Sequence, residues 1–355
     1  MDERSSFSHG QYQARIRWNT QASGAAFDRK KRSFLNAEAQ AFLAQRVMCV
    51  LAGMNEQGSL SGQLIFGPPG FAQSPEPSRC LLDLDEESSH SDWLKNLHRR
   101  NGGQVGLFFI SHATRQRLCV HGQVEGPPKQ TWVARLLFRR PHPCRLGIRV
   151  QQAFFHCPRY IRTSIPGLTT SPVVQFDRER LFEEFQDGSR NALSGYLGDF
   201  LRQHVSCFLC TANRQGVCSI NHRGGAPGFL TALSPEECSP GGKLLLPDYK
   251  GNGAFEAIGN ILETGLATII VPDYSMQVAL TISGLAQILE PDELPPDLRA
   301  KCIGAERVVS LAVQRVALQS GDWTLPLAYE QATAQRPERQ GSVLHCSGEH
   351  RALLT

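Results

Sequence analysis

Two short segments of the chain carry the residue types that bind a phosphate group. In the first, Arg223 precedes Gly224 and Gly225, so a guanidinium fork stands beside backbone that lacks Cβ atoms and lets a ligand approach closely. In the second, Lys250 precedes a Gly-Asn-Gly loop that permits positive φ and exposed N–H groups. A segment with helical spacing follows, and its N-terminus would favour an anion. We therefore expect residues 222–225 and 249–252 to converge on an anionic ligand.

An internal repeat indicates how these segments are positioned. GPPGF begins at residue 67 and GAPGF at residue 225, 158 residues apart, and the same offset relates Cys49 to Cys207 and Gln57-Gly58 to Gln215-Gly216. Downstream, GLFFISHATRQRLCVHGQV aligns with ATIIVPDYSMQVALTISGLAQI, with about four further residues inserted between the motifs. Several motifs in the same order predict a tandem duplication.

Each copy has the pattern of a small antiparallel barrel. Residues 47–52 and 205–211 are β-rich runs, each followed by a polar loop that ends in glycine, which is typical of a hairpin. Short strands at this spacing favour a barrel over a parallel sheet, with a helix inside each copy at 92–100 and 253–263. The predicted fold is mainly β, with two tandem split β-barrels that form an intramolecular pseudo-dimer. The predicted domains are an N-terminal arm and helix (1–46), a first barrel (47–157), a linker with a helix (158–204), a second barrel (205–328) and a disordered tail (329–355).

The composition limits the class of protein. The chain has 355 residues, 41% hydrophobic and 20% charged, with a net charge of +4, which is too small to argue for a nucleic-acid partner. No apolar run approaches the ~18–20 residues that span a bilayer, and the charged N-terminus lacks the apolar core of a secretory signal. The 11 scattered cysteines are an odd number, so we interpret them as free thiols in a reducing, cytoplasmic compartment.

The motifs resemble those of a known family. HRGGAPGF (222–229), LLLPDYKGN (244–252) and AIGNILE (257–263) are similar to the second half of tandem pyridoxamine 5′-phosphate oxidase-like proteins, and LIFGPPGF, RQRLCVHG and FFHCPRYI are similar to the first half. GAERVV (304–309) resembles the family's closing strand. The resemblance implies two split barrels packed like the subunits of a homodimer, with FMN in the cleft between them.

The resemblance and the residue chemistry together define the candidate site. The cofactor-binding candidates are His222, Arg223, Gly224, Gly225, Tyr249, Lys250, Asn252, Asn260, Arg115 and Arg117. The first copy has Leu64 and Ile65 where the second has His222 and Arg223. This predicts one flavin site built from complementary halves, with two sites as the alternative. Arg115 and Arg117 are expected to alternate along one strand and share a face.

Other motifs favour structural interpretations. Cys207 and Cys210 form a CxxC, but residues three apart on a strand point to opposite faces, and no second CxxC exists to complete a metal site; no metal is predicted. GNGAFE lacks the third glycine and the parallel context of a dinucleotide-binding turn. The basic run at 29–32 (RKKR) is interpreted as a solvated arm.

Three functions are compatible with these residues. The first is an FMN-dependent oxidoreductase, in which the flavin carries the hydride or electrons, with an unknown small-molecule substrate and NAD(P)H as a candidate donor. The second is a flavin-binding or flavin-storing module without turnover. The third is a haem-binding split barrel with His121 or His222 as axial ligand. Neither a nucleic acid nor a membrane is expected as partner, and the chain is expected to be a monomeric pseudo-dimer or a homodimer.

Overall fold

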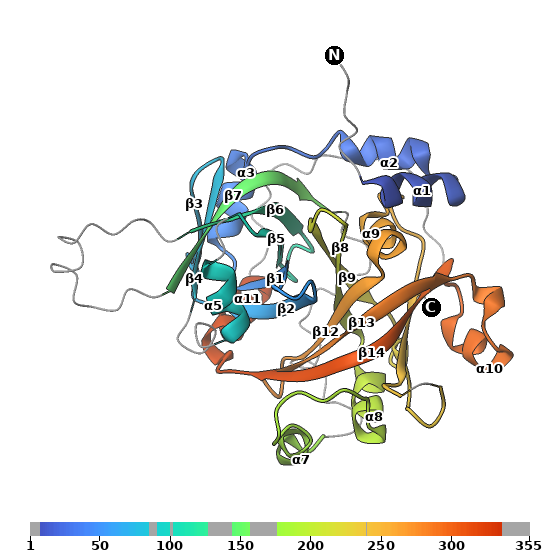
Figure 1. Ribbon diagram of the computed structural model, residues 1–355. Helices are drawn as coiled ribbons and strands as arrows, with labels where there is room; N and C mark the ends of the chain where they lie inside the picture. Colours follow the sequence, from blue (N-terminus) through green and yellow to red (C-terminus); the bar gives the residue numbers. More distant parts are fainter. Residues whose placement is uncertain are drawn as a thin grey trace.

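The computed structural model describes residues 8–84, 91–99, 102–126, 144–156, 176–238 and 240–335. Two seven-stranded antiparallel sheets make up most of it (Figure 1). The first sheet contains β1 (Met48–Met54), β2 (Leu60–Phe66), β3 (Ala72–Glu76), β4 (Arg79–Leu84), β5 (Gln104–Ile110), β6 (Arg117–Glu125) and β7 (Cys144–Phe155). The second contains β8 (Ser206–Ala212), β9 (Cys218–Gly224), β10 (Thr231–Leu233), β11 (Lys243–Asp248), β12 (Leu266–Asp273), β13 (Val278–Leu289) and β14 (Arg307–Ser320).

The two sheets repeat one topology. The first runs β2-β1-β5-β6-β7-β4-β3, and the second, counted from the matching edge, runs β9-β8-β12-β13-β14-β11-β10. The helix between the fourth and fifth strands also recurs, as α5 (Asp92–Arg99) and α9 (Glu256–Thr264), and so does the helix before the first strand, as α3 (Ala37–Ala44) and α8 (Gly195–Gln203). The predicted fold of two tandem split barrels is confirmed by this strand order.

Further helices surround the barrels. Helices α1 (His9–Arg17) and α2 (Gln21–Asp28) precede the first barrel and lie beside α9, while α7 (Arg178–Glu183) and α8 lie against the second sheet (Figure 1). Helix α10 (Pro296–Arg299), with the short 3₁₀ turns η1 (Pro291–Glu293) and η2 (Ala300–Cys302), links β13 to β14. Helix α11 (Thr324–Gln335) follows β14. None of the described helices is long and apolar enough to cross a membrane.

Two expectations are wrong in part. The segment expected to be disordered from residue 329 begins inside α11, where Glu330 is buried and its carboxylate accepts a hydrogen bond from the backbone N–H of His112 at 2.8 Å; residues 336–355 lie outside the described part. The RKKR run is not a solvated arm throughout. The ammonium of Lys31 is buried and lies 2.6 Å from Glu256 and 3.3 Å from Asp28, so these carboxylates hold the run against α9.

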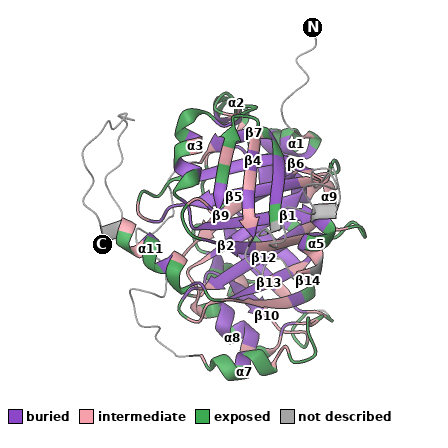
Figure 2. Ribbon diagram, turned by 90° about the vertical axis from the view of Figure 1, so that its left-hand side faces the viewer, coloured by how far each residue is buried: buried purple, intermediate pink, exposed green. Residues whose placement is uncertain are grey.

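The buried side chains form three main cores. One fills the first barrel and one fills the second. The third lies between the barrels and draws on both, with Leu64, Phe66 and Phe108 from the first and Phe208 and Ile220 from the second. Figure 2 shows buried residues running through the strands, and exposed residues on outer helices such as α2, α7 and α11. The barrels therefore share a continuous apolar interface, as the predicted pseudo-dimer requires.

Backbone contact at this interface is close. A Cβ built on Gly106 would lie 2.7 Å from the carbonyl oxygen of Cys218 in the other barrel. Across the same interface, the Thr268 hydroxyl donates to the Leu60 carbonyl at 3.0 Å. The CxxC cysteines point to opposite faces as predicted, because Cys207 belongs to the core of the second barrel and Cys210 to the core between the barrels.

Candidate cofactor site between the barrels

A cavity of about 310 Å³ lies where the second barrel meets the first, and we call it the cationic cavity. Residues 221–224 at the end of β9 line one part of it. Residues 247–249 and 251–258, from the end of β11 to the first turn of α9, line another. Phe108, Arg117 and His156 contribute from the first barrel, Lys30 from the N-terminal segment and Arg307 from the start of β14. The expected convergence of 222–225 and 249–252 is therefore confirmed as geometry.

Asp248 organises the cations of this cavity. Its carboxylate accepts a hydrogen bond from Nη1 of Arg223 on one oxygen and, at 2.8 Å, from Nε of Arg307 on the other. The side chain of Asp248 is 5% exposed and that of Arg307 3%. Arg307 also pairs with the partly exposed carboxylate of Glu306 at 2.8 Å, so one carboxylate faces two guanidinium groups only in the buried part of the cluster. A buried charge excess of this kind stabilises an additional anion.

The whole lining is net cationic. Lys30, Arg117, Arg223 and Arg307 face Asp248 and Glu256, four positive against two negative side chains. The histidines add no charge at neutral pH. Burial, helped by Arg117, lowers the pKa of His156 to about 3. Burial also lowers the pKa of His222 well below its usual range.

Several buried polar atoms at the cavity have no hydrogen-bond partner among the described residues. They are Nε of Arg223, Nδ1 of His222 and Nε2 of His156. Buried polar groups are almost always satisfied in native proteins, and leaving one unsatisfied costs roughly 1–3 kcal/mol. A bound polar ligand would satisfy these atoms.

Helix α9 begins at this cavity. Its N-cap residue, Phe255, has a left-handed φ of 54° and provides no side-chain cap, so the first-turn N–H groups of residues 256–258 keep their donor capacity. A non-glycine residue in this conformation stores strain, which is common at functional sites. The Arg307 guanidinium lies 4.6 Å from the centre of the Phe255 ring, a cation–π contact that helps to hold the turn.

Glu256 separates this cavity from a neighbouring one of about 440 Å³, because it lines both. Burial by itself would raise the pKa of Glu256, but the Lys31 ammonium and nearby His121 and His156 lower it to about 2. The side chain therefore remains a carboxylate. The neighbouring cavity is also lined by Lys31, His121, Ser219 and Asn260.

The structure places the predicted residues in three groups. His222, Arg223, Gly224, Tyr249, Asn252 and Arg117 line the cationic cavity. Asn260 instead lines the neighbouring cavity and donates a hydrogen bond to Thr211 at 3.1 Å. Gly225 and Lys250 are adjacent to lining residues without being part of the lining; a Cβ on Gly225 would lie 2.6 Å from Cβ of Phe229, which identifies it as a packing position in the turn.

Arg115 is the clear correction. Strand β6 begins at Arg117, and Arg115 lies in the preceding turn with a φ of 56°, where it is exposed. The two arginines do not share a strand face. The expected alternation assumed that the strand begins two residues earlier, whereas the hairpin closes through Ser111 N–H to the Gln116 carbonyl.

Sequence reasoning missed Asp248, Arg307, Glu256, Lys30 and His156. Asp248 and Arg307 both lie in motifs that carry the family resemblance, LLLPDYKGN and GAERVV. The available signal was a carboxylate, Asp248, two residues before the predicted cation Lys250. A second signal was Arg307 at the start of β14, the strand that pairs with β11. The register of β11 with β14 places Asp248 opposite Arg307, but this pairing cannot be read from the sequence.

Comparisons with known proteins give a likeness to solved structures alone. No protein-family model matches the chain, and no curated protein matches it. HupZ of Group A Streptococcus is 12% identical, with 36% of this chain and 100% of that chain covered and a TM-score of 0.27. A protein of the pyridoxinephosphate oxidase family from Clostridium acetobutylicum is 9% identical, with 42% and 92% covered and a TM-score of 0.25.

HutZ, the heme storage protein of Vibrio cholerae, is 16% identical, with 34% of this chain and 93% of that chain covered and a TM-score of 0.23. At this level of similarity, the fold of the present chain rests on its own two sheets and their identical strand order.

Proposed function

We propose that this protein binds a phosphorylated flavin of the FMN type in the cationic cavity and acts as a flavin-dependent oxidoreductase. The observation that carries the proposal is the pair Arg223 and Arg307 on one buried carboxylate, beside the uncapped start of α9. Guanidinium groups and helix N-termini are the donors that phosphate prefers in proteins. When bound, the flavin would supply the hydride or electron transfer.

The residues present fit such a group. Arg223 and Arg307 would hold the phosphate, and the loop at 251–253 would approach it through the backbone. A Cβ on Gly251 would meet only the Tyr249 carbonyl oxygen, at 3.9 Å. The cavity volume of about 310 Å³ is at the small end of the ~300–1,000 Å³ range of ligand sites. A complete FMN would therefore extend past Glu256 toward the neighbouring cavity.

Titration of the purified protein with FMN tests the proposal. We expect one FMN per chain, because Leu64 and Ile65 replace His222 and Arg223 in the other barrel. Two equal sites would contradict the asymmetric arrangement. Reduction of the bound flavin by NAD(P)H separates an oxidoreductase from a flavin-storing module, because only the oxidoreductase needs to exchange electrons with a donor.

Arg223→Ala is the sharpest variant. Loss of one charge-assisted contact should cost roughly 1.5–3 kcal/mol of FMN affinity, about tenfold or more in Kd. Folding should persist because Arg307 still pairs with Asp248. Arg145→Ala is the matched control, since Arg145 makes an exposed pair with Asp83 away from the cavity. An unchanged affinity in R223A removes Arg223 from the site.

A haem-binding function is the second candidate, and a specific observation favours it. The rings of His156 and His222 both line the cationic cavity, and each has a buried nitrogen without a hydrogen-bond partner among the described residues. Neutral imidazole is a common axial ligand of haem iron. An absorption spectrum decides between the two, because haem binding gives a Soret band that His222→Ala should shift or abolish.

A further inference from the structure

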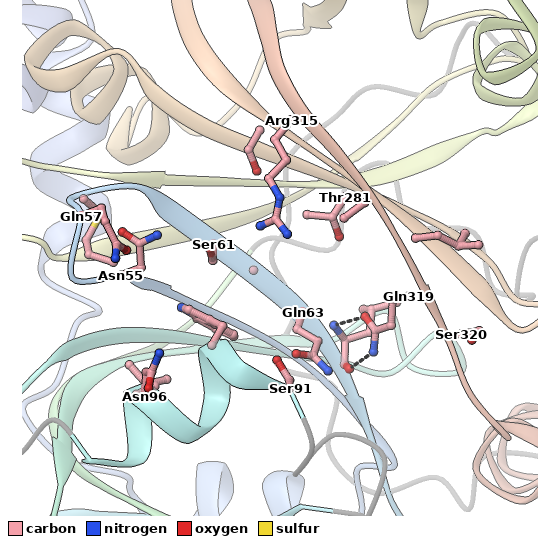
Figure 3. A pocket seen from close by; sticks show the side chains of 18 of the residues that line it. Asn55, Gln57, Ser61, Gln63, Ser91, Asn96, Thr281, Arg315, Gln319 and Ser320 are labelled. Atoms are coloured by element: carbon pink, nitrogen blue, oxygen red, sulfur yellow. Dashed lines mark hydrogen bonds between the residues drawn. The ribbon is translucent and has the colours of Figure 1, made fainter. Parts of the chain in front are cut away.

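A third cavity, of about 610 Å³, is also lined by both barrels, and we call it the amide-lined cavity (Figure 3). It is formed by the turn between β1 and β2, by β2 and by α5 of the first barrel, together with β13, β14 and Trp323 of the second. Its lining residues are Met54, Asn55, Glu56, Gln57, Ser61, Gly62, Gln63, Leu64, Phe66, Ser91, Trp93, Asn96, Leu97, Thr281, Ser283, Arg315, Ala317, Leu318, Gln319, Ser320 and Trp323.

This cavity occupies the place that is equivalent, under the duplication, to the cofactor cleft. Strand β2 corresponds to β9, and β13 and β14 correspond to β6 and β7. Leu64 takes the position of His222. The paired registers of the long strands place Gln319 where the first barrel has His156. The amide of Gln319 donates to the Leu64 carbonyl at 2.6 Å and accepts from the Leu64 N–H at 3.0 Å. The phosphate-binding chemistry has been replaced here.

The lining is polar and almost uncharged. Amide and hydroxyl side chains make up ten of the lining residues, namely Asn55, Gln57, Ser61, Gln63, Ser91, Asn96, Thr281, Ser283, Gln319 and Ser320. Gln63 and Thr281 make no side-chain hydrogen bond with the rest of the described chain. Such groups can both donate to and accept from hydroxyl groups, so the cavity offers hydrogen bonds on several sides at once.

Arg315 is the single cation of the lining. Its guanidinium points into the cavity, toward Ser61 and Thr281 (Figure 3). It has neither an ion pair nor a hydrogen bond with any described residue. Arg315 and the one acidic lining residue, Glu56, are both exposed. One guanidinium matches one carboxylate in a bidentate pair, whereas a phosphate ester with two negative charges would lack a second cation.

Trp93 supplies an independent sign of a ligand. Its indole Nε1 is buried and has no hydrogen-bond partner among the described residues, although an indole N–H that is withdrawn from water normally finds an acceptor. Farther along the lining, Trp323 stacks on Phe66 with ring centres 4.4 Å apart and an interplanar angle of 20°. The cavity therefore combines apolar ring surface with one unused donor.

We propose that the amide-lined cavity is a second ligand site, for a hydroxyl-rich molecule with a single carboxylate, of the sugar-acid class. Arg315 pairs with the carboxylate, the amide and hydroxyl side chains bind the hydroxyl groups, and Trp93 donates to a ring or hydroxyl oxygen. The proposal is independent of what binds in the cationic cavity.

Titration of the full chain with glucuronate, followed by calorimetry and tryptophan fluorescence, tests the site. We expect saturable binding, with glucose and inorganic phosphate each at least tenfold weaker. Arg315→Gln should raise the Kd for glucuronate at least about tenfold, as expected for a lost charge-assisted contact. The weak affinity of the protein for glucose should be the same with and without this substitution. Trp93→Phe keeps the ring and removes the donor, so it should weaken both sugars.

Arg149→Gln is the matched control, because Arg149 is an exposed strand arginine outside both cavities, and its affinity should equal that of the parent. Three results would overturn the proposal. They are no saturable glucuronate binding in the millimolar range, a Kd that Arg315→Gln leaves unchanged, and displacement of glucuronate by FMN with the loss of FMN binding in Arg315→Gln.

Discussion

At the scale of single residues, Asp248 determines how the two arginines of the cationic cavity are held. Asp248→Asn removes the buried anionic partner of Arg223 and leaves Arg307 paired only with the partly exposed Glu306. We expect a loss of about 3 kcal/mol in the free energy of unfolding, as for other broken buried pairs, measured by urea denaturation. Asp83→Asn, which breaks the more exposed pair with Arg145, should cost less than about 1 kcal/mol. An equal loss of unfolding free energy in both variants would show that Asp248 does not stabilise the two arginines more than an exposed ion pair would.

His156 makes stability depend on pH. Its pKa in the folded protein is about 3, whereas an unfolded chain has a histidine pKa of roughly 6.5. The unfolded state therefore binds the extra proton first, so the contribution to stability is complete above pH ~6.5 and is lost as the pH falls toward 3.

His156→Gln tests this dependence and mimics Gln319 at the equivalent position of the other barrel. Across the range between the two pKa values, one proton corresponds to a slope of up to ~1.4 kcal/mol per pH unit. We expect the variant to have a shallower fall in the free energy of unfolding between pH 6 and 4, measured from denaturant midpoints. An identical slope would mean that His156 is protonated in the folded state.

At the scale of elements, the N-terminal helices are fastened to α9 by one buried ion pair. Lys31 approaches Glu256 at 2.6 Å. The Arg15 side chain, also buried, donates to the Ala254 carbonyl. Replacing Lys31 by Met leaves the buried carboxylate of Glu256 without this cation. The expected loss in the free energy of unfolding is about 3–5 kcal/mol.

Arg29→Met is the matched control for Lys31→Met, because Arg29 belongs to the same basic run but is exposed; its change should remain within about 0.5 kcal/mol. Limited proteolysis adds a local measurement, because the N-terminal helices should be cleaved faster in Lys31→Met. If Lys31→Met leaves both the stability and the cleavage rate unchanged, the ion pair does not hold this segment against α9.

The sequence predicts the elements within each barrel better than the contacts between distant segments. The repeat and the turn residues are local patterns, so the strands, the hairpins and the outward and inward faces of Cys207 and Cys210 could all be predicted. Lys31 and Arg307 could not be placed in the same way. Lys31 meets Glu256 across more than two hundred residues of chain, and nothing near position 31 distinguishes a buried lysine from the exposed Arg29.

The same difference between local patterns and distant contacts applies to the candidate site. Arg223 and the 249–252 loop follow from residue types that bind phosphate, and the structure brings them together. Arg115 was misplaced because a shift of two residues in a hairpin changes which side chains lie on the strand. The neutral histidines follow from burial, which depends on how the two barrels pack.

At the scale of the whole molecule, the shared core predicts that the two barrels unfold together. Its members come from both barrels, and Gly106 marks a close backbone approach, since a Cβ there would lie 2.7 Å from the Cys218 carbonyl oxygen. Gly106→Ala must therefore push the barrels apart or distort a strand, and overpacking of this kind costs typically 1–3 kcal/mol.

Gly195→Ala at the start of α8 is the control, because open space surrounds that position; it should be neutral or slightly stabilising. Calorimetry should give a single transition for the parent and a single, lower Tm for Gly106→Ala. Two separate transitions in the parent would show that the barrels are independent folding units, and the cavities between them would then lose the rigid walls on which both proposed sites depend.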